Sequence, residues 1–123
     1  MPAPMEPTLR VTMLPRDTNA RGTIFGGVIL SHIDLAGAVA ASRQAQRNFV
    51  TRAMREVEFI APVYVGDVVS FYASVLRLGT TSVTIKVDVE AERAKDPSCK
   101  VKVTAAEVIY VAVDEAGNPI ALR

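Results

Sequence analysis

The segment from Gly26 to Ala41 constrains the fold of this chain more than any other part of the sequence. Its only polar residues are Ser31, His32 and Asp34, so a helix formed here has no polar face. The sequence therefore predicts a helix that the rest of the protein surrounds, with the Asp34 carboxylate in a poorly hydrated place. Burying an ionised carboxylate is costly unless another group holds it, which makes Asp34 a candidate for chemistry. A structural aspartate, hydrogen-bonded to backbone or to a partner chain, fits the same pattern.

The composition limits the classes of function to be considered. The chain has 123 residues, enough for one domain with a core of its own. Its lysines and arginines number 14 against 13 acidic residues, and no basic run supports nucleic-acid binding. Half of the residues are hydrophobic although only 6% are aromatic. Such an excess of apolar residues favours a subunit interface.

Cysteine usage and the N-terminal residues favour a soluble cytoplasmic protein. Cys99 is the only cysteine, which excludes an intrachain disulfide and suits a reducing compartment. Residues 1–7 contain three prolines and no apolar stretch, so they predict no signal peptide. The apolar stretch from Ile24 to Ala41 is interrupted by glycines, His32 and Asp34, which argues against a membrane span.

Hydrophobic periodicity predicts one helix and five strands in a single domain over residues 1–123. A strand over residues 9–14 and a polar loop over 15–23 precede the helix, which is expected over 27–46. From residue 50 onward, apolar residues recur at every second position, as in half-buried strands. These strands are expected over residues 50–60, 67–78, 81–91 and 100–114, with a charged loop over 93–98. Residues 1–8 are expected to be a flexible lead.

The order of these elements predicts an α+β fold, with an antiparallel sheet wrapped around one long central helix. A helix of about 20 residues spans about 30 Å, enough to cross the face of a curved sheet. The last strand contains a conflict, because Val101 and Val103 share a face with Glu107 while Val108 and Tyr110 share the other. Either a β-bulge near residues 105–107 restores the alternation, or both faces of this strand are covered.

Residues around the start of the helix suit acyl transfer to water. Gly26 and Gly27 permit close approach to the backbone, and the first amides of a helix can stabilise a carbonyl oxygen that acquires negative charge. Asn19, in the preceding loop, can donate and accept hydrogen bonds. Asp34 could supply the base, and a thioester needs no nucleophilic triad because its thiolate leaves readily. Close packing at the two glycines and a turn at Asn19 are the structural alternatives.

Other catalytic arrangements fit the sequence poorly. His32 points about 160° away from Asp34 around a helix at ~100° per residue, so Ser31, His32 and Asp34 form a poor triad. His32 is therefore expected to be a packing or interface residue. One histidine and one cysteine cannot supply a zinc site, so neither a metal nor a cofactor is predicted.

The spacing of the candidate residues predicts an active site shared between two chains. Asp34 follows Gly27 at a distance of about 10.5 Å along a helix axis, at 1.5 Å per residue. One thioester carbonyl cannot easily contact both the Gly27 amide and a water held by Asp34 of the same chain. A twofold dimer with antiparallel helices would bring Gly27 of one chain opposite Asp34 of the other.

Residues 17–27 and 30–37 form a distinctive block of sequence. Two further stretches, residues 59–69 and 110–114, belong to the same pattern. Together these stretches resemble the acyl-CoA thioesterases of the hotdog fold, in the acyl-CoA hydrolase branch. The resemblance implies an obligate dimer, often assembled into hexamers, that hydrolyses acyl-CoA to a free acid and CoA. By position, Asp34 would be the general base or nucleophile, Asn19 its partner, and Gly26 and Gly27 the oxyanion donors.

The resemblance also implies that a hairpin turn helps to hold CoA, namely Gly79, Thr80, Thr81 and Ser82. Arg55 is a further candidate contact for the substrate. The chain departs from its relatives at several positions, among them Arg55 and Glu58, where relatives show other polar residues. Phe25 stands where others carry histidine, Ala61 replaces a common lysine, and Thr80 stands where a basic residue is frequent.

Two other functions compete with thioester hydrolysis. A hotdog dehydratase or hydratase needs a histidine with an acidic residue, and the corresponding Asp-x-Asn-Pro-x-His pattern stops here at Asp17-Thr18-Asn19. A non-catalytic acyl-CoA sensor of this fold would bind the same ligand but carry an additional DNA-binding region. No segment of this sequence is a candidate for such a region.

Overall fold

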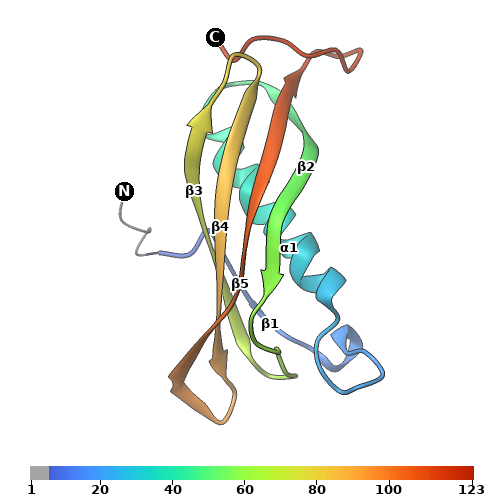
Figure 1. The fold of residues 1–123 in the computed structure, drawn as a ribbon, viewed down its shortest axis with the longest axis vertical. Coiled ribbons are helices and arrows are strands. Elements are labelled where there is room, and N and C mark those ends of the chain that lie inside the picture. The colour runs from blue at the N-terminus through green and yellow to red at the C-terminus, as the bar shows by residue number, and fades with distance from the viewer. Residues whose placement is uncertain (1–5) are drawn as a thin grey trace.

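Five antiparallel strands and one long helix account for most of the structure (Figure 1). The structure is a computed structural model and describes residues 6–123. In chain order the elements are β1 (Leu9–Thr12), a short 3₁₀ helix η1 (Pro15–Asp17), α1 (Gly26–Ser42), β2 (Asn48–Phe59), β3 (Val68–Leu78), β4 (Ser82–Arg93) and β5 (Asp96–Val113). The strands form one sheet in the order β1-β3-β4-β5-β2, so β1 and β2 are its edges.

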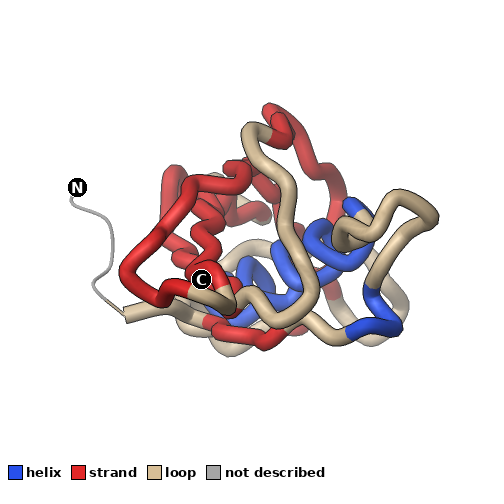
Figure 2. The backbone as a smooth tube through the Cα atoms, turned by 90° about the horizontal axis from the view of Figure 1, so that it is seen from below, coloured by secondary structure: helices blue, strands red, loops and turns tan. Residues whose placement is uncertain are grey.

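The helix lies across one face of the sheet, chiefly against β3 and β4. Seen from below, the strands curve around it (Figure 2). Ile29, Ile33 and Ala36 line its buried side and pack into a core with apolar side chains of the strands, among them Phe71 and Ile85. The predicted hotdog arrangement, a curved antiparallel sheet around one helix, is therefore confirmed.

One prediction about the helix is wrong, because this chain does not surround it. Four residues at a spacing of four, Gly27, Ser31, Leu35 and Val39, form a stripe that faces outward. Leu35 is 58% exposed and Val39 is 41% exposed. A single sheet covers only one side of a helix, and the described residues place nothing over the other side. Asp34, at the border of this stripe, is half-buried rather than sealed from water.

Several element boundaries differ from those expected. The helix ends at Ser42 rather than near residue 46, because the amides of Arg43 and Gln44 bond three residues back, to Ala40 and Ala41, and tighten the last turn. The expected charged loop over 93–98 is a tight hairpin, in which Arg93 of β4 pairs with Asp96 of β5. Within residues 6–123, no helix is long and apolar enough to cross a membrane.

The N-terminal segment is described only from residue 6 onward. Thr8 is held to β3, because its amide donates to the Phe71 carbonyl at 2.8 Å. Residues 1–5 of the expected flexible lead lie outside the described part of the chain.

A β-bulge does occur in β5, two residues before the expected position. Val89 of β4 pairs with Thr104, and the next residue, Glu90, pairs with Lys102, which leaves Val103 as the extra residue. Both Val103 and Thr104 are fully buried as a result. After the bulge, the even-numbered residues of β5 from Thr104 to Ala112 face the helix.

Candidate active site

The Asp34 carboxylate receives hydrogen bonds from two strands. Thr51, near the start of β2, donates from Oγ1 to Asp34 Oδ1 at 2.7 Å. Tyr110 of β5 donates from its hydroxyl to the Asp34 carbonyl at 2.7 Å and lies 3.1 Å from Asp34 Oδ1. No hydrogen bond within residues 6–123 reaches Asp34 Oδ2, and no unbonded side-chain polar atom there is buried. Oδ2 is therefore open to water while Oδ1 is fixed.

Tyr110 supplies a hydroxyl that stays protonated. Its side chain is only 1% exposed. Burial, followed by the neighbouring Asp34 carboxylate, raises the pKa of Tyr110 well above its ordinary value. At neutral pH the hydroxyl is therefore protonated and serves as a hydrogen-bond donor to Asp34.

Gly37 makes the contact between Tyr110 and the helix possible. A Cβ atom added at Gly37 would lie 2.2 Å from the Tyr110 hydroxyl oxygen and 2.9 Å from its Cζ. Only a residue without a side chain can stand where the tyrosine ring crosses the helix. Thr51, Tyr110 and Gly37 are not among the site residues predicted from the sequence.

The start of α1 is accessible and has no side-chain cap. Phe25 occupies the N-cap position without a capping hydrogen bond. A Cβ added at Gly26 would lie 3.5 Å from its nearest neighbour, the Phe59 ring. A Cβ added at Gly27 would lie 3.9 Å from its nearest neighbour, the Phe25 ring. Both are ordinary contact distances, so crowding does not explain the two glycines. Their absent side chains leave the first-turn backbone open to another molecule.

Asn19 organises the loop that leads to the helix. Its Oδ1 accepts from the amides of Arg21, at 2.8 Å, and Thr23, at 3.2 Å, and its Nδ2 donates to Thr23 Oγ1 at 2.9 Å. All these bonds lie within residues 19–23, so in a single chain Asn19 has the turn role that was the structural alternative. Asn19 and Asp34 do not meet within one chain.

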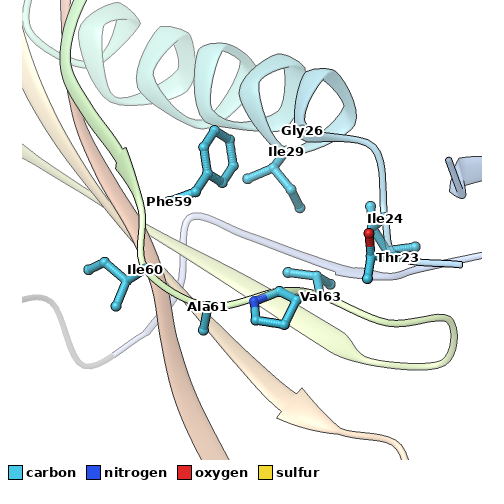
Figure 3. A pocket seen from close by; sticks show the side chains of 9 residues that line it. Thr23, Ile24, Gly26, Ile29, Phe59, Ile60, Ala61 and Val63 are labelled. Atoms are coloured by element: carbon cyan, nitrogen blue, oxygen red, sulfur yellow. The ribbon is translucent and has the colours of Figure 1, made fainter. Parts of the chain in front are cut away.

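A cavity of about 330 Å³ opens beside the first turn of the helix (Figure 3). The helix contributes Gly26 and Ile29, and the end of β2 contributes Phe59. The connection from β2 to β3, residues 60–63, forms another wall, and Thr23 and Ile24 complete the lining. The predicted oxyanion donors and this cavity therefore share one end of the helix.

His32 is a packing residue, which confirms one of the two roles expected for it. Its ring stacks on Phe71 of β3 with centroids 5.7 Å apart, and its Nδ1 contacts the Val28 carbonyl at 2.8 Å. Ser31 donates to the same carbonyl at 2.8 Å. Both side chains are thus held by the preceding turn of the helix, and neither bonds to Asp34 within the described residues.

The residues expected to contact CoA lie apart from the start of the helix. The turn over residues 79–82, between β3 and β4, is at the opposite end of the sheet from the N-terminus of α1 (Figure 1). Arg55 forms an ion pair of 3.1 Å with Glu107. Since Tyr110 faces the helix, Glu107 and its partner Arg55 lie on the other face of the sheet. Within one chain, neither group is near Asp34.

Within residues 6–123, no three histidine, cysteine or acidic side chains gather in a way that could hold a metal ion. The groups available for chemistry are the Asp34 carboxylate, the two hydroxyls that orient it and the backbone amides at the start of α1.

The sequence matches a family model described as Thioesterase superfamily over residues 21–98. The chain belongs to this superfamily. It is thus a thioester hydrolase, and the predicted membership of the hotdog-fold acyl-CoA thioesterases is confirmed.

Named relatives of this thioesterase cover nearly its whole length. The acyl-CoA thioester hydrolase YciA of Escherichia coli strain K12 is 44% identical over 93% of this chain and 88% of its own. A hexameric hotdog fold thioesterase of Campylobacter jejuni has 42% identity and a TM-score of 0.88, over 96% of this chain and 90% of that one. A hexameric thioesterase of Yersinia pestis has 42% identity and a TM-score of 0.89, over 96% and 95%.

Proposed function

We propose that this thioesterase hydrolyses acyl-CoA to a free carboxylic acid and CoA, with Asp34 as the general base or nucleophile. The observation that carries the proposal is the fixed orientation of Asp34, whose Oδ1 is bonded to Thr51 and Tyr110 while Oδ2 stays open. A catalytic carboxylate needs one reactive oxygen held in a constant direction. The name of the E. coli relative, an acyl-CoA thioester hydrolase, supports the choice of substrate.

The Asp34 carboxylate can promote hydrolysis by either of two routes. As a base, Asp34 Oδ2 accepts a proton from water while the water oxygen bonds to the thioester carbon. The carbon–sulfur bond then breaks, and the CoA thiolate takes up the proton. As a nucleophile, the same oxygen bonds to the thioester carbon while the carbon–sulfur bond breaks and the CoA thiolate leaves. Water then cleaves the resulting anhydride, which restores the Asp34 carboxylate and releases the acid, and the proton freed from water passes to the thiolate. Both routes place negative charge on the carbonyl oxygen in the transition state.

The amides of Gly26 and Gly27 are the proposed donors to that oxygen. The positive end of the helix dipole and unpaired first-turn amides favour negative charge. The absence of a capping side chain at Phe25, and the free space beside both glycines, support this assignment. Asn19 lies in the loop just before these amides, where it can hold the loop and bond to the substrate or the attacking water.

The site is proposed to form between two copies of the chain. The exposed stripe along the helix, which includes Leu35 and Val39, is an apolar surface that a second copy would cover. Strand β2 is an unpaired sheet edge on its outer side, because it bonds only to β5. Two copies related by a twofold axis would set Gly27 of one helix opposite Asp34 of the other. The hexameric relatives support assembly.

Replacement of the carboxylate tests the proposed activity. Asp34→Asn should lower kcat for every acyl-CoA hydrolysed by about 100- to 10,000-fold, the usual contribution of a general base. CoA release from acyl-CoAs of different length measures the rate, and calorimetry with CoA measures binding. Asp88→Asn on β4, a similar carboxylate on the other face of the sheet, should retain activity. Unchanged turnover in Asp34→Asn would contradict the site, and binding without any turnover by the wild type would indicate a sensor.

A charge in the exposed stripe tests the shared site. Leu35→Glu should separate the chains, because a carboxylate cannot be buried in an apolar interface without a partner. Light scattering should then report a smaller particle, with activity lost although Asp34 is intact. Leu76→Glu is the matched control, since Leu76 is 51% exposed on β3. A fully active monomer of Leu35→Glu would rule out the shared site.

A further inference from the structure

The cavity beside the first turn of α1 is lined chiefly by apolar side chains. Ile29 projects from the helix, Val63 lies below it, and Phe59 stands between the helix and the end of β2 (Figure 3). Ile29 and Val63 are buried, whereas Phe59 is 47% exposed. The floor of the cavity therefore belongs to the core, whereas Phe59 forms a partly exposed wall that can be substituted without disturbing the core.

The lining carries no charged side chain. Thr23 is its only polar side chain, and the Thr23 hydroxyl oxygen already accepts a hydrogen bond from Asn19. A carboxylate or ammonium group inside this space would lose part of its hydration and would find no side chain of opposite charge in the lining. The cavity therefore suits an uncharged, apolar group.

Its position relative to the helix determines which part of a substrate can enter. Gly26 belongs both to the cavity lining and to the first turn of α1. When a thioester carbonyl oxygen is bound to the first-turn amides, the two substituents of the carbonyl carbon point away from the helix end. One substituent is the sulfur of CoA, which is followed by a polar chain, and the other is the acyl group. Only the acyl group matches an apolar cavity.

We propose that this cavity holds the acyl group and that Phe59 sets the length of chain it accepts. This inference rests on the proposed hydrolysis of acyl-CoA. A volume of about 330 Å³ lies at the lower end of the range of ligand pockets, about 300–1,000 Å³, which favours short and medium acyl chains. Acyl groups that end in a carboxylate, such as succinyl, are disfavoured by a lining without charged side chains.

Two opposite substitutions of Phe59 test the proposal. Phe59→Ala enlarges the cavity, and Phe59→Trp reduces it. The measured quantity is the ratio of kcat/KM for decanoyl-CoA to that for butyryl-CoA. Phe59→Ala should raise this ratio by about 10-fold or more, because a single methylene in an apolar pocket already changes kcat/KM by about 10- to 200-fold. Phe59→Trp should lower the ratio.

Two controls separate acyl binding from other effects. Leu76→Ala, which removes a similarly exposed apolar side chain on β3, should leave the ratio unchanged. Phe59→Leu gives a milder reduction in size if the alanine variant does not fold. Inhibition by free CoA should be equal in wild type and all Phe59 variants, since CoA without an acyl group does not enter the cavity.

The outcomes also distinguish this inference from the proposed function. A wild type that hydrolyses no acyl-CoA refutes the function itself. Suppose instead that the wild type hydrolyses butyryl-CoA. If the Phe59 substitutions then change kcat/KM equally for all acyl chain lengths, or change only the inhibition by CoA, the cavity assignment alone is refuted. Wild-type kcat/KM for succinyl-CoA should be lower than for butyryl-CoA by about 100-fold, given the cost of burying an unpaired charge. Equal values would also overturn the assignment.

Discussion

Thr51 Oγ1 on β2 donates a hydrogen bond of 2.7 Å to Asp34 Oδ1 in the middle of α1. Tyr110 of β5 reaches the same oxygen at 3.1 Å. The helix and two neighbouring strands therefore meet at one carboxylate oxygen. Rotation of the carboxylate would break both contacts, so its second oxygen keeps a constant direction. This arrangement leads to three predictions, and a fourth concerns the turn between β2 and β3.

Removal of the Thr51 hydroxyl should slow the reaction without preventing binding. Thr51→Val keeps the shape of the side chain but loses the donor, so Asp34 can rotate. We expect kcat to fall about 10-fold, the lower end of what a hydrogen bond to a charged group contributes, because Thr51 is exposed. KM should change little, and Thr51→Ser should recover most of the rate. Thr84→Val on β4 is the control, and an equal loss there would argue against a specific role of Thr51.

A side chain at Gly37 should destabilise the fold through Tyr110. Gly37→Ala places a Cβ 2.2 Å from the Tyr110 hydroxyl oxygen, so ring or helix must shift. We expect the free energy of unfolding to fall by about 1–3 kcal/mol, as for other overpacked sites. Urea denaturation measures this change. The double variant with Tyr110→Phe should recover part of this loss. Gly27→Ala, which meets its nearest atom at 3.9 Å, should cost nothing. Equal stability of Gly37→Ala and wild type would contradict the contact.

Alkaline pH should destabilise the wild type more than a variant without the Tyr110 hydroxyl. Burial raises the pKa of Tyr110 in the folded protein above its ordinary value of 10.0. Above pH 10 the unfolded chain therefore loses a proton that the folded chain retains, and stability falls with rising pH. The loss attributable to this group is about 1.4 kcal/mol per pH unit at most. Tyr110→Phe lacks this contribution, while both proteins retain Tyr64 and Tyr72. Parallel stability curves from pH 9 to pH 11 would disprove the burial of a neutral phenol.

Asp67 should be essential for the turn that leads from β2 to β3. It is 2% exposed and accepts hydrogen bonds from the Tyr64 amide at 2.9 Å and the Arg93 guanidinium at 2.6 Å. Asp67→Ala leaves that cation without its partner and should lower the free energy of unfolding by about 3 kcal/mol or more. Asp88→Ala, without such contacts, should cost far less. A small effect in thermal or urea unfolding would show that the ion pair is dispensable.

The element order and the place of Asp34 could be predicted from the sequence. Residues 26–41 are apolar or glycine except for Ser31, His32 and Asp34, which indicates a helix, and alternation from residue 50 onward indicates strands. The same pattern overstates burial, however. Leu35 and Val39 are apolar, yet they are exposed in one chain. Hydrophobicity alone does not distinguish side chains of a core from side chains of a subunit interface.

The partners of Asp34 could not be predicted, because they depend on strand order. Tyr110 is 76 residues from Asp34, and it reaches the helix only because β5 lies between β4 and β2. Gly37 was the one local signal, since a glycine three residues after Asp34 permits a close approach at the same side of the helix. Without the position of β5, that glycine has no assignable partner.

The bulge in β5 was misplaced for a related reason. A bulge near residues 105–107 would put Thr104 on the outer face of the sheet, but Thr104 is fully buried. Its hydroxyl donates to the Glu58 carbonyl, which satisfies the polar group inside the protein. In a sequence pattern, a buried threonine with a backbone partner cannot be told from a surface residue. The bulge that shifts the alternation of β5 is therefore predicted too far along the strand.

The central claim is that Asp34 of one chain acts on a thioester held at the helix start of another. Mixing Asn19→Ala chains with Asp34→Asn chains tests it most directly. In a shared site, each mixed dimer pairs the intact Asn19 of one chain with the intact Asp34 of the other. CoA release should then rise well above that of either variant alone, to one working site in each mixed dimer. Mixed dimers, verified by mass spectrometry, that remain as inactive as the separate variants would contradict the account.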